Sequence, residues 1–352
     1  MRISTRAVFA VAATALTAGT LTACGSDDKD TKDTNGTKGE NRAGSAAPVA
    51  GGGSPGGGSG PRIKVVATTT QVADFVRNVG GDRVEVTQLI KANASAHEYE
   101  ATPTDLNAIR AAKLVVENGV DMEKAWLPKA VQAAGFKGPV VDTSVGVQLR
   151  KGEHEEHEEH AQQEEHEEHE HGEYDPHIWH NPLNAKVMVT NIAKALTAAD
   201  GANAKVYENN LAGYAAKLDA LDADNRAKLD GIPAANRKLV TNHDALGYYV
   251  DRYRLEFVGS IIPSFDDQAE LSGSRIEDVV ARIKATGAKA VFAESALPPK
   301  TAATIAREAG VKVVAGDDSL YADSLGASGS AGATYLASEA HNTDTIVAAL
   351  RG

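Results

Sequence analysis

Short apolar runs that alternate with amphipathic stretches dominate this 352-residue chain from Pro61 onward. Most runs are near-continuous Val, Ile, Leu and Ala, which is typical of strands that helices cover on both faces. The first set is Ile63–Thr69, Val84–Ile90, Lys113–Asn118 and Pro139–Asp142, and the second is Lys238–Asn242, Leu255–Ile261, Ala288–Ala293 and Val311–Ala315. Strands that alternate with helices form parallel sheets. The sequence therefore predicts an α/β fold with two parallel-sheet lobes, each of about four βα units.

A long helical pattern separates the two sets of runs. After Asp200-Gly201, apolar residues recur at spacings of four and three, and Gly231 and Pro233 end the pattern. These residues are Tyr207, Leu211, Tyr214, Leu218 and Leu221. We predict a rigid helix at 201–232 that joins a lobe at 62–200 to a lobe at 233–352. A dimeric coiled coil is the alternative, but so few heptads with few complementary flanking charges do not favour it, and we expect a monomer.

The beginning of the chain has the pattern of an export signal. Arg2 and Arg6 form a positive start, and an apolar run from Val8 follows. This run is shorter than the about 20 apolar residues that a membrane span needs. It ends in Leu21-Thr22-Ala23-Cys24, which resembles the bacterial motif for acylation of a cysteine. We predict a signal peptide at 1–23, lipidation of Cys24 and a disordered tether over 24–61, with a chance cysteine as the alternative.

The cysteine count limits the chemistry of the exported part. Cys24 is the only cysteine of the chain, so disulfides and thiolate ligands are excluded, and any metal site must use His, Asp, Glu or backbone oxygen. Losing Arg2 and Arg6 with the signal changes the formal net charge from −12 to −14, and eleven glutamates within 153–173 account for −11 of it. The remaining −3 is spread over a body with no basic stripe, so we expect no nucleic-acid partner.

The segment 153–173 is a low-complexity insertion of Glu and His. A segment of this composition is expected to be disordered because its like charges repel each other. Its six histidines are candidate auxiliary, low-affinity metal ligands: His154, His157, His160, His166, His169 and His171. The segment would gather metal or sense a surplus of it, and a solvated linker with incidental histidines is the alternative.

Four residues outside this segment are candidate metal ligands. His97 and His243 follow predicted strands, His177 lies in a loop marked by Asp175-Pro176, and Asp323 follows the last predicted strand. Ligands of open α/β sheets bind beyond the carboxyl ends of the strands, and three imidazoles with one carboxylate suit tetrahedral Zn²⁺. The spacing alone is weak support, since any one such histidine is more often a capping or surface residue than a ligand.

Motifs along almost all of residues 62–352 resemble those of the zinc/manganese-type substrate-binding lipoproteins of ABC metal importers (cluster A-I, ZnuA-like). They are Val65-Val66-Ala67-Thr68-Thr69-Thr70, Gly80-Gly81-Asp82, His97-Glu98-Tyr99-Glu100, Glu117-Asn118-Gly119, Asp175-Pro176-His177-Ile178-Trp179, Thr241-Asn242-His243-Asp244-Ala245, Gly247-Tyr248-Tyr249, Ala322-Asp323-Ser324-Leu325 and Thr334-Tyr335-Leu336. The resemblance implies two α/β lobes joined by a long helix, with a metal buried between them.

The resemblance also implies the metal ligands. They are His97 and His177 from the first lobe, and His243 and Asp323 from the second. Asn93-Ala94-Ser95-Ala96 departs from the Gly, Asp and Pro that usually precede the first histidine of the family, which affects the local turn more than the ligand. His180 stands where the family is usually apolar, and we expect it to face solvent at a helix start. His341 lies on an Ala-rich terminal helix and is expected at the surface.

The resemblance implies a high-affinity receptor that delivers a metal to an ABC permease and its ATPase. Family members that select manganese tend to carry a carboxylate where this chain has His243, and imidazole suits Zn²⁺ better than Mn²⁺. We therefore predict an extracytoplasmic, lipid-anchored zinc receptor of the zinc-specific branch, with Zn²⁺ as transported ligand. A manganese receptor is the first alternative. A surface adhesin is the second.

An enzyme is a further alternative that the sequence does not favour. The chain has no His-Glu-x-x-His, no Gly-x-Ser-x-Gly and no phosphate-binding loop. Four protein ligands would leave no open position for a reactive water. This alternative would be a zinc hydrolase with Glu294 or Glu98 as general base.

Overall fold

A computed structural model describes residues 60–97, 99–151, 173–262, 264–267 and 273–351. The described residues belong to one compact unit, and residues 1–55 lie outside the described part of the chain. The predictions of a signal peptide and of lipidation at Cys24 therefore fall on residues that the structure does not describe.

The first lobe, which we define as β1–β4 with α1–α4, contains a four-stranded parallel sheet of order β2-β1-β3-β4. Its strands are β1 (Ile63–Ala67), β2 (Val84–Gln88), β3 (Leu114–Glu117) and β4 (Val140–Asp142). Its helices are α1 (Thr70–Gly80), α2 (Pro103–Ala111), α3 (Leu127–Ala134) and α4 (Pro182–Ala199). Thr69 caps α1 through its side chain, and Thr102 and Asp105 form a capping box on α2. The predicted continuous burial is confirmed at β1, where Val65, Val66 and Ala67 are all buried.

The second lobe, which we define as β5–β8 with α6–α8, is also built from parallel strands. Its strands are β5 (Lys238–His243), β6 (Glu256–Ile262), β7 (Ala290–Phe292) and β8 (Lys312–Val314), and its helices are α6 (Gly247–Tyr253), α7 (Gly273–Thr286) and α8 (Lys300–Ala309). The strands form two hydrogen-bonded pairs, β5–β6 and β7–β8, and β5 lies beside β7. The α/β class is confirmed. The four strands of this lobe do not form one continuous hydrogen-bonded sheet within the described residues. At the end of β5, the backbone N–H of His243 donates to the Glu294 carboxylate and not to a neighbouring strand.

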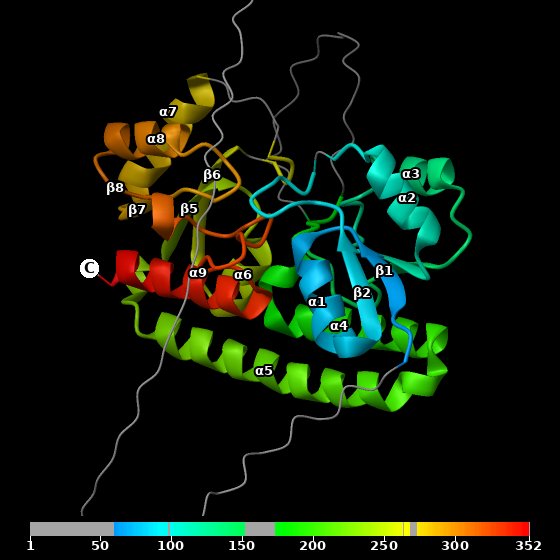
Figure 1. Ribbon diagram of the computed structural model, residues 1–352. Coiled ribbons are helices and arrows are strands. Elements are labelled where there is room, and N and C mark those ends of the chain that lie inside the picture. The colour runs from blue at the N-terminus through cyan, green and yellow to red at the C-terminus, as the bar shows by residue number, and fades with distance from the viewer. Residues whose placement is uncertain (1–59, 98, 152–172, 263, 268–272, 352) are drawn as a thin grey trace, which may run out of the picture. The chain divides into compact units, whose positions relative to one another are not determined.

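Two helices contribute to both lobes. Helix α5 (Ala204–Asp230) buries Tyr207, Tyr214, Leu218 and Leu221 in the core of the first lobe and Leu229 in a core of the second. Figure 1 shows α5 beneath both lobes, where it packs against α4 and α9 (Tyr335–Leu350). The final helix, α9, likewise places its first residue in the first core and its last residues in a second-lobe core. Both helices are therefore anchored in each lobe.

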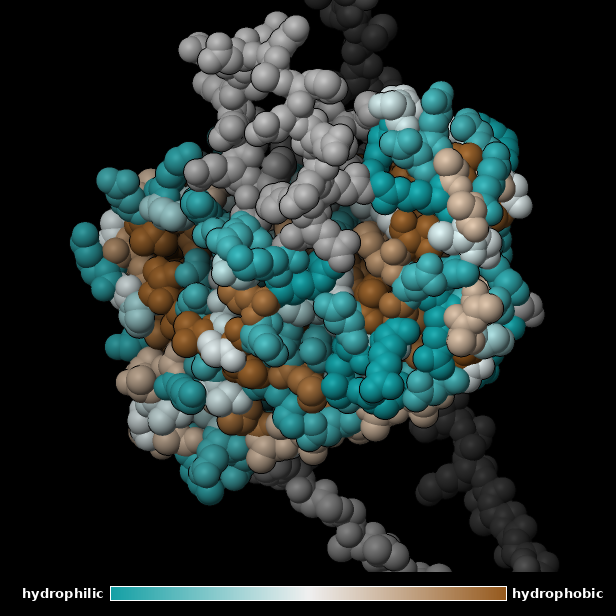
Figure 2. All heavy atoms as spheres, turned by 180° about the vertical axis from the view of Figure 1, so that it is seen from behind, coloured by the Kyte–Doolittle hydropathy of each residue, from teal (hydrophilic) through white to brown (hydrophobic). Residues whose placement is uncertain are grey.

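The surface offers no membrane-spanning element within the described ranges. No helix there combines the length and the apolarity that a membrane span requires. Figure 2 shows hydrophilic side chains over much of one face, with hydrophobic side chains in small groups between them.

Substitution of Gly119 is expected to destabilise the first lobe. Gly119 follows β3 with φ at 89°, and an added Cβ would clash with the Asp142 carboxylate. We expect Gly119→Ala to lower the free energy of unfolding by about 1–3 kcal/mol because of left-handed backbone strain and this clash. Urea unfolding of the metal-free chain measures the effect. Gly213→Ala, on an exposed turn of α5 with open space around it, is the control and should not destabilise. Equal unfolding midpoints for the two variants would contradict the prediction.

Candidate metal centre

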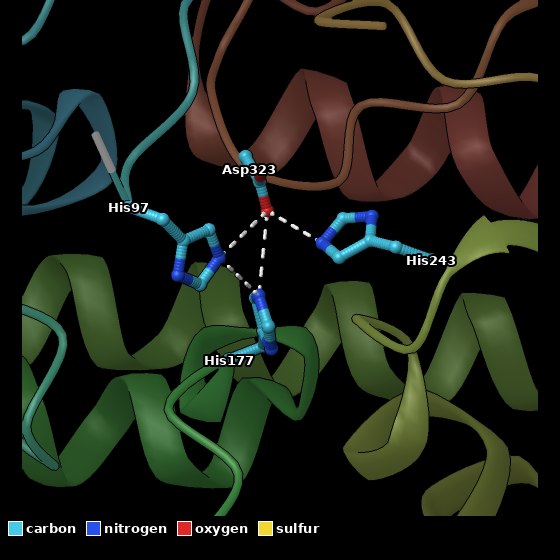
Figure 3. A group of neighbouring side chains, drawn as sticks. All are labelled: His97, His177, His243 and Asp323. Atoms are coloured by element: carbon cyan, nitrogen blue, oxygen red, sulfur yellow. Dashed lines mark hydrogen bonds and ion pairs between the residues drawn. The ribbon is translucent and has the colours of Figure 1, made fainter. Parts of the chain in front are cut away.

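Four side chains that are distant in sequence converge at one point. One potential ligand atom from each of His97, His177, His243 and Asp323 lies within 4.8 Å of all the others (Figure 3). The Oδ1 atom of Asp323 is 3.1 Å from Nε2 of His243, 3.3 Å from Nε2 of His177 and 3.8 Å from Nε2 of His97. The Nε2 atoms of His97 and His177 are 3.2 Å apart. Tetrahedral zinc with bonds of about 2.0–2.1 Å separates its ligand atoms by about 3.3 Å, so the cluster has the dimensions of such a site.

The backbone elements explain why these residues meet. His97 lies in the loop after β2, His177 directly precedes the short helical turn Ile178–His180, and His243 is the last residue of β5. Asp323 lies between β8 and α9. Parallel strands bring their carboxyl ends to the same edge of a sheet, where ligands of α/β folds are bound. The structure thus brings together all four residues that the sequence singled out.

The cluster is almost closed to solvent. His177 and His243 are fully buried, Asp323 is 1% exposed, and the side chain of His97 is 10% exposed. His97 also lines a cavity of about 460 Å³ with Tyr99, Glu100, Ala125 and Trp126. Among the four residues, His97 is therefore the one that an incoming ion can reach first.

A buried carboxylate orients the His177 ring. Asp175 Oδ1 lies 2.8 Å from His177 Nδ1 and also accepts from the backbone N–H of His177 at 2.9 Å. The other oxygen, Oδ2, lies 3.4 Å from the Arg150 guanidinium. Burial by itself lowers the pKa of His177, but hydrogen bonds and charges of Asp175 and Asp323 outweigh it and raise that pKa to about 9. Since Nδ1 is occupied by a carboxylate, Nε2 is the nitrogen that faces the cluster.

Glu294 plays the same part for His243. Its Oε2 lies 2.6 Å from His243 Nδ1, and its Oε1 accepts from the His243 backbone N–H at 2.9 Å. Burial lowers the pKa of His243, but the charges of Glu294 and Asp323 raise it well above its usual value. From the sequence, Glu294 was a candidate only for the base of an alternative enzyme, and its orienting role was not predicted. Its position directly after the Ala288–Ala293 run, at the same edge as His243, was the available signal.

Among the described residues, Asp323 completes the cluster with its one carboxylate ligand. Burial raises the pKa of Asp323, but the charge of His243 and contacts with the three imidazoles hold it well below its usual value. Neither carboxylate oxygen of Asp323, nor Nε2 of His243, forms a hydrogen bond of ordinary geometry within the described residues. Buried polar atoms without a hydrogen-bond partner destabilise the folded state unless an ion or a proton binds to them. The donor set and its orphaned atoms therefore fit a divalent cation.

Two other histidines differ from expectation. His180 was predicted to face solvent and is fully buried, with Nδ1 2.8 Å from Glu339 Oε1 and Nε2 3.1 Å from the Ala322 carbonyl oxygen. His341 was predicted at the surface and is half-buried, 3.1 Å from a backbone carbonyl oxygen. Both contacts come from packing of α9 and the 319–323 region, which no local pattern reveals. Neither histidine belongs to the metal-ligand cluster.

The predicted auxiliary ligands lie outside the described residues. His154, His157, His160, His166, His169 and His171 all fall within 152–172. The residues that flank this segment are close together, since Lys151 forms an antiparallel bridge with Tyr174 and an ion pair of 2.6 Å with Glu173. Arg150, next to that bridge, contacts the Asp175 carboxylate that orients His177. The segment is thus inserted close to one candidate ligand.

Loss of the Glu294 charge is expected to weaken metal binding without removing a ligand. Glu294→Gln leaves an amide beside His243 Nδ1, so the ring loses both its fixed orientation and part of its basicity. We expect zinc affinity to fall by about 10- to 100-fold, measured by competition with a chelator. Glu308→Gln, an exposed position on α8, is the matched control. An affinity equal to that of the control would show that Glu294 does not act on His243.

Comparisons with known proteins identify the family of this chain. A family model described as "Zinc-uptake complex component A periplasmic" (ZnuA) matches residues 65–349, a range that includes all four cluster residues. The manganese ABC transporter substrate-binding lipoprotein PsaA of Streptococcus anginosus is 28% identical over 299 residues, covering 83% of this chain and 90% of the relative.

Solved structures are similar over the same range. The periplasmic zinc binding protein TroA from Treponema pallidum has a TM-score of 0.71 and 27% identity, covering 83% of this chain and 100% of that one. A mutant, Mn-bound periplasmic metal binding protein from Candidatus Liberibacter asiaticus has a TM-score of 0.69 and 25% identity, covering 82% and 100%. The relatives therefore carry the names of two metals.

Proposed function

Because this chain belongs to the ZnuA family of zinc-uptake complex component A proteins, we propose that its cargo is Zn²⁺. As a member of this family, the chain is an extracytoplasmic metal-binding receptor of an ABC importer and not an enzyme. His97, His177, His243 and Asp323 would bind the ion as the four ligands. The chain would then deliver it to a membrane permease that is driven by a separate ATPase.

One observation carries the proposal: three imidazole nitrogens and one carboxylate oxygen lie within 4.8 Å of one another in an almost solvent-free position. Zinc binds imidazole ligands well, whereas manganese prefers carboxylate, carbonyl and water ligands. Four protein ligands match closed zinc sites, in which no position is left for a reactive water. This arrangement supports capture of the ion and gives it no means to react.

The surrounding charges support binding of a dication. Asp323 would neutralise one charge directly, and Asp175 and Glu294 stand behind two of the imidazoles. Carboxylates in this position fix the ring orientation and increase the basicity of the ligating nitrogen. Metal entry would displace the protons that these same carboxylates stabilise on His177 and His243.

The domain organisation is part of the proposal. We propose a signal peptide at 1–23, a lipidated Cys24 with a tether over 24–61, lobes at 62–200 and 233–352, and a connecting helix at 201–232. Relatives such as PsaA are named as lipoproteins, which supports the lipid anchor on the outer face of the membrane. The His/Glu insertion 153–173 would serve as an auxiliary, low-affinity collector of zinc.

Manganese is the second candidate cargo, since several similar proteins are named as manganese receptors. Against it stands the donor set of this chain, in which carboxylate oxygen is one ligand out of four. Manganese forms the weakest complexes of the common first-row divalent ions. The site would therefore need more carboxylate character than it has to select manganese over zinc.

A competition titration decides between the two metals. The metal-free chain is titrated with each ion against a chelator, and we expect one tight site with manganese weaker by about two orders of magnitude or more. A chain without 153–171 should keep that tight site. Equal affinities would assign the chain to manganese, and loss of the tight site with the insertion would contradict the four-ligand assignment. A deletion strain that grows normally in zinc-starved medium would instead favour a role such as adhesion.

A further inference from the structure

The segment 320–325, which carries the carboxylate ligand, follows β8 and therefore begins in the second lobe. Its first residues are attached there. Leu320 donates from its backbone N–H to the Ala293 carbonyl at 2.9 Å, and its side chain lies in a second-lobe core. Tyr321 exchanges two hydrogen bonds of 2.8 Å with the side-chain amide of Asn342. Leu320 is thus bound to the second lobe, as its place in the chain suggests, and Tyr321 is bound to α9, which contributes to both lobes.

From Ala322 onward the same segment is bound to the first lobe. The carbonyl oxygen of Ala322 accepts from Trp179 Nε1 at 3.2 Å and lies 3.1 Å from His180 Nε2. Both of these side chains belong to the turn that directly follows the ligand His177, and both are buried. The carbonyl directly before the Asp323 residue is thus attached to the same turn as a first-lobe ligand.

The start of α1 provides a second attachment. Gln71 donates from Nε2 to the backbone carbonyl of Asp323 at 3.0 Å, and Leu325 donates from its N–H to Thr70 Oγ1 at 2.8 Å. Thr70 in turn donates from Oγ1 to Gln71 Oε1 at 2.9 Å, which links the two contacts. The Leu325 side chain lies in the core of the first lobe, and its carbonyl accepts from Asn93 N–H at 3.3 Å. The contacts of Thr70 and Gln71 are buried, where hydrogen bonds are costly to break.

His243 has the opposite attachment. It is the last residue of β5 and pairs with Ile262 of β6, and both of its hydrogen bonds to Glu294 lie within the second lobe. Its Nε2 atom, which faces the cluster, forms no hydrogen bond within the described part of the chain. Among the four cluster residues, it alone is anchored entirely to the second lobe.

We infer that three of the four ligands move with the first lobe and one moves with the second lobe. Thr70, Gln71 and His180 are positioning residues for Asp323. The inference rests on the proposed function as a metal receptor. His97, His177 and Asp323 form a face that stays intact when the lobes separate, and His243 is the ligand that closes on the ion at capture and leaves first at release. Chain order alone predicts two ligands from each lobe.

The test uses Co²⁺ as a spectroscopic probe on the full chain with and without His243→Ala. We expect the His243→Ala chain to retain Co²⁺ on the three-ligand face, with a d–d spectrum changed from that of the four-ligand site. Thr70→Val, which removes the acceptor of Leu325 N–H, is expected to lower Co²⁺ affinity by about tenfold in both backgrounds. Thr70→Ser keeps the hydroxyl and should restore the affinity. A chain with both His177→Ala and Asp323→Ala gives the background from the His/Glu insertion.

Two results would overturn the inference. One is a Thr70→Val effect that disappears in the His243→Ala background, since Asp323 would then depend on the second lobe for its position. The other is Co²⁺ binding by His243→Ala no stronger than the background chain. Gln71→Met, scored in the same way, guards against a fold defect specific to position 70, and circular dichroism checks each variant. Failure of the unmodified chain to bind Co²⁺ or Zn²⁺ tightly would instead contradict the proposed function.

Discussion

Replacing His177 with alanine is expected to weaken zinc binding by roughly 100- to 1,000-fold. Structural zinc sites bind with about 10–16 kcal/mol, so one of four ligands accounts for about 3–4 kcal/mol, and about 1.4 kcal/mol corresponds to a tenfold change. His177 is fully buried, and no other described histidine or carboxylate lies in the cluster to replace it. The variant also leaves the buried Asp175 carboxylate without its imidazole partner. Chelator competition with Zn²⁺ measures the loss.

The matched control for this prediction is His341→Ala. His341 is a half-buried histidine outside the cluster, whose ring nitrogen contacts only a backbone carbonyl among the described residues. Its removal should leave zinc affinity within about threefold, which is the scale of an indirect effect. If the two alanine variants bound zinc equally well, the four-ligand centre would be wrong, and the high-affinity site would have to be sought elsewhere in the chain.

Acidification from pH 8 to pH 6 is expected to weaken zinc binding by about 100- to 10,000-fold. The pKa of His177 is raised to about 9 and that of His243 lies well above its usual value, because Asp175, Glu294 and Asp323 stabilise the imidazolium forms. Zinc binds only neutral imidazole, so below pH 9 each bound ion must displace one or two protons. Each displaced proton costs about a factor of ten per pH unit. The sign is therefore a rise of affinity with pH that levels off only above about pH 9.

This pH range separates the cluster from ordinary histidines. Unperturbed imidazoles, with pKa values of about 6.5, would give an affinity that changes little above pH 7. Titrations at pH 7, 8 and 9, corrected for protonation of the chelator, measure the slope, and calorimetry in buffers of different ionisation enthalpy counts the released protons. The chain with His177→Ala and Asp323→Ala reports the background. An affinity that does not change between pH 7 and pH 9 would contradict the raised pKa values of His177 and His243. It would also contradict the neighbouring carboxylates as the cause of those shifts.

The secondary structure was largely accessible from local pattern. Each of the eight apolar runs became a strand, with ends that differ by no more than two residues, as for Val311–Ala315 and β8 at Lys312–Val314. The spacing of four and three between Tyr207 and Leu221 corresponds to the buried face of α5. Periodicity is a local property, since it depends only on which neighbouring side chains must leave water together.

The pairing of strands was less accessible. The first set forms one sheet, whereas the second forms the pairs β5–β6 and β7–β8. Whether neighbouring strands complete a hydrogen-bond ladder depends on long-range competition for each backbone group. At the end of β5, the His243 N–H is taken by the Glu294 side chain, 51 residues further along the chain.

The candidate metal centre shows the same contrast between local patterns and long-range contacts. Residue type and position after predicted strands, together with family resemblance, were sufficient to select His97, His177, His243 and Asp323. The groups that orient them were less evident: Asp175 is only two residues from His177, yet its role depends on a contact between side chains. Glu294 and Glu339 meet their histidines across far longer stretches of chain.

By itself the sequence determined the elements of this protein, the residue types available for a metal and the exclusion of thiolate chemistry, because these follow from local periodicity and composition. Only the tertiary structure decided that His180 is buried against Glu339, that Gln71 donates to the Asp323 carbonyl and that Leu325 donates to Thr70. Those contacts join groups more than 140 residues apart, and they satisfy polar atoms that packing of the two lobes buries. A local pattern contains no information about such partners, and for this reason the lobe that holds each ligand could be read only from the folded chain.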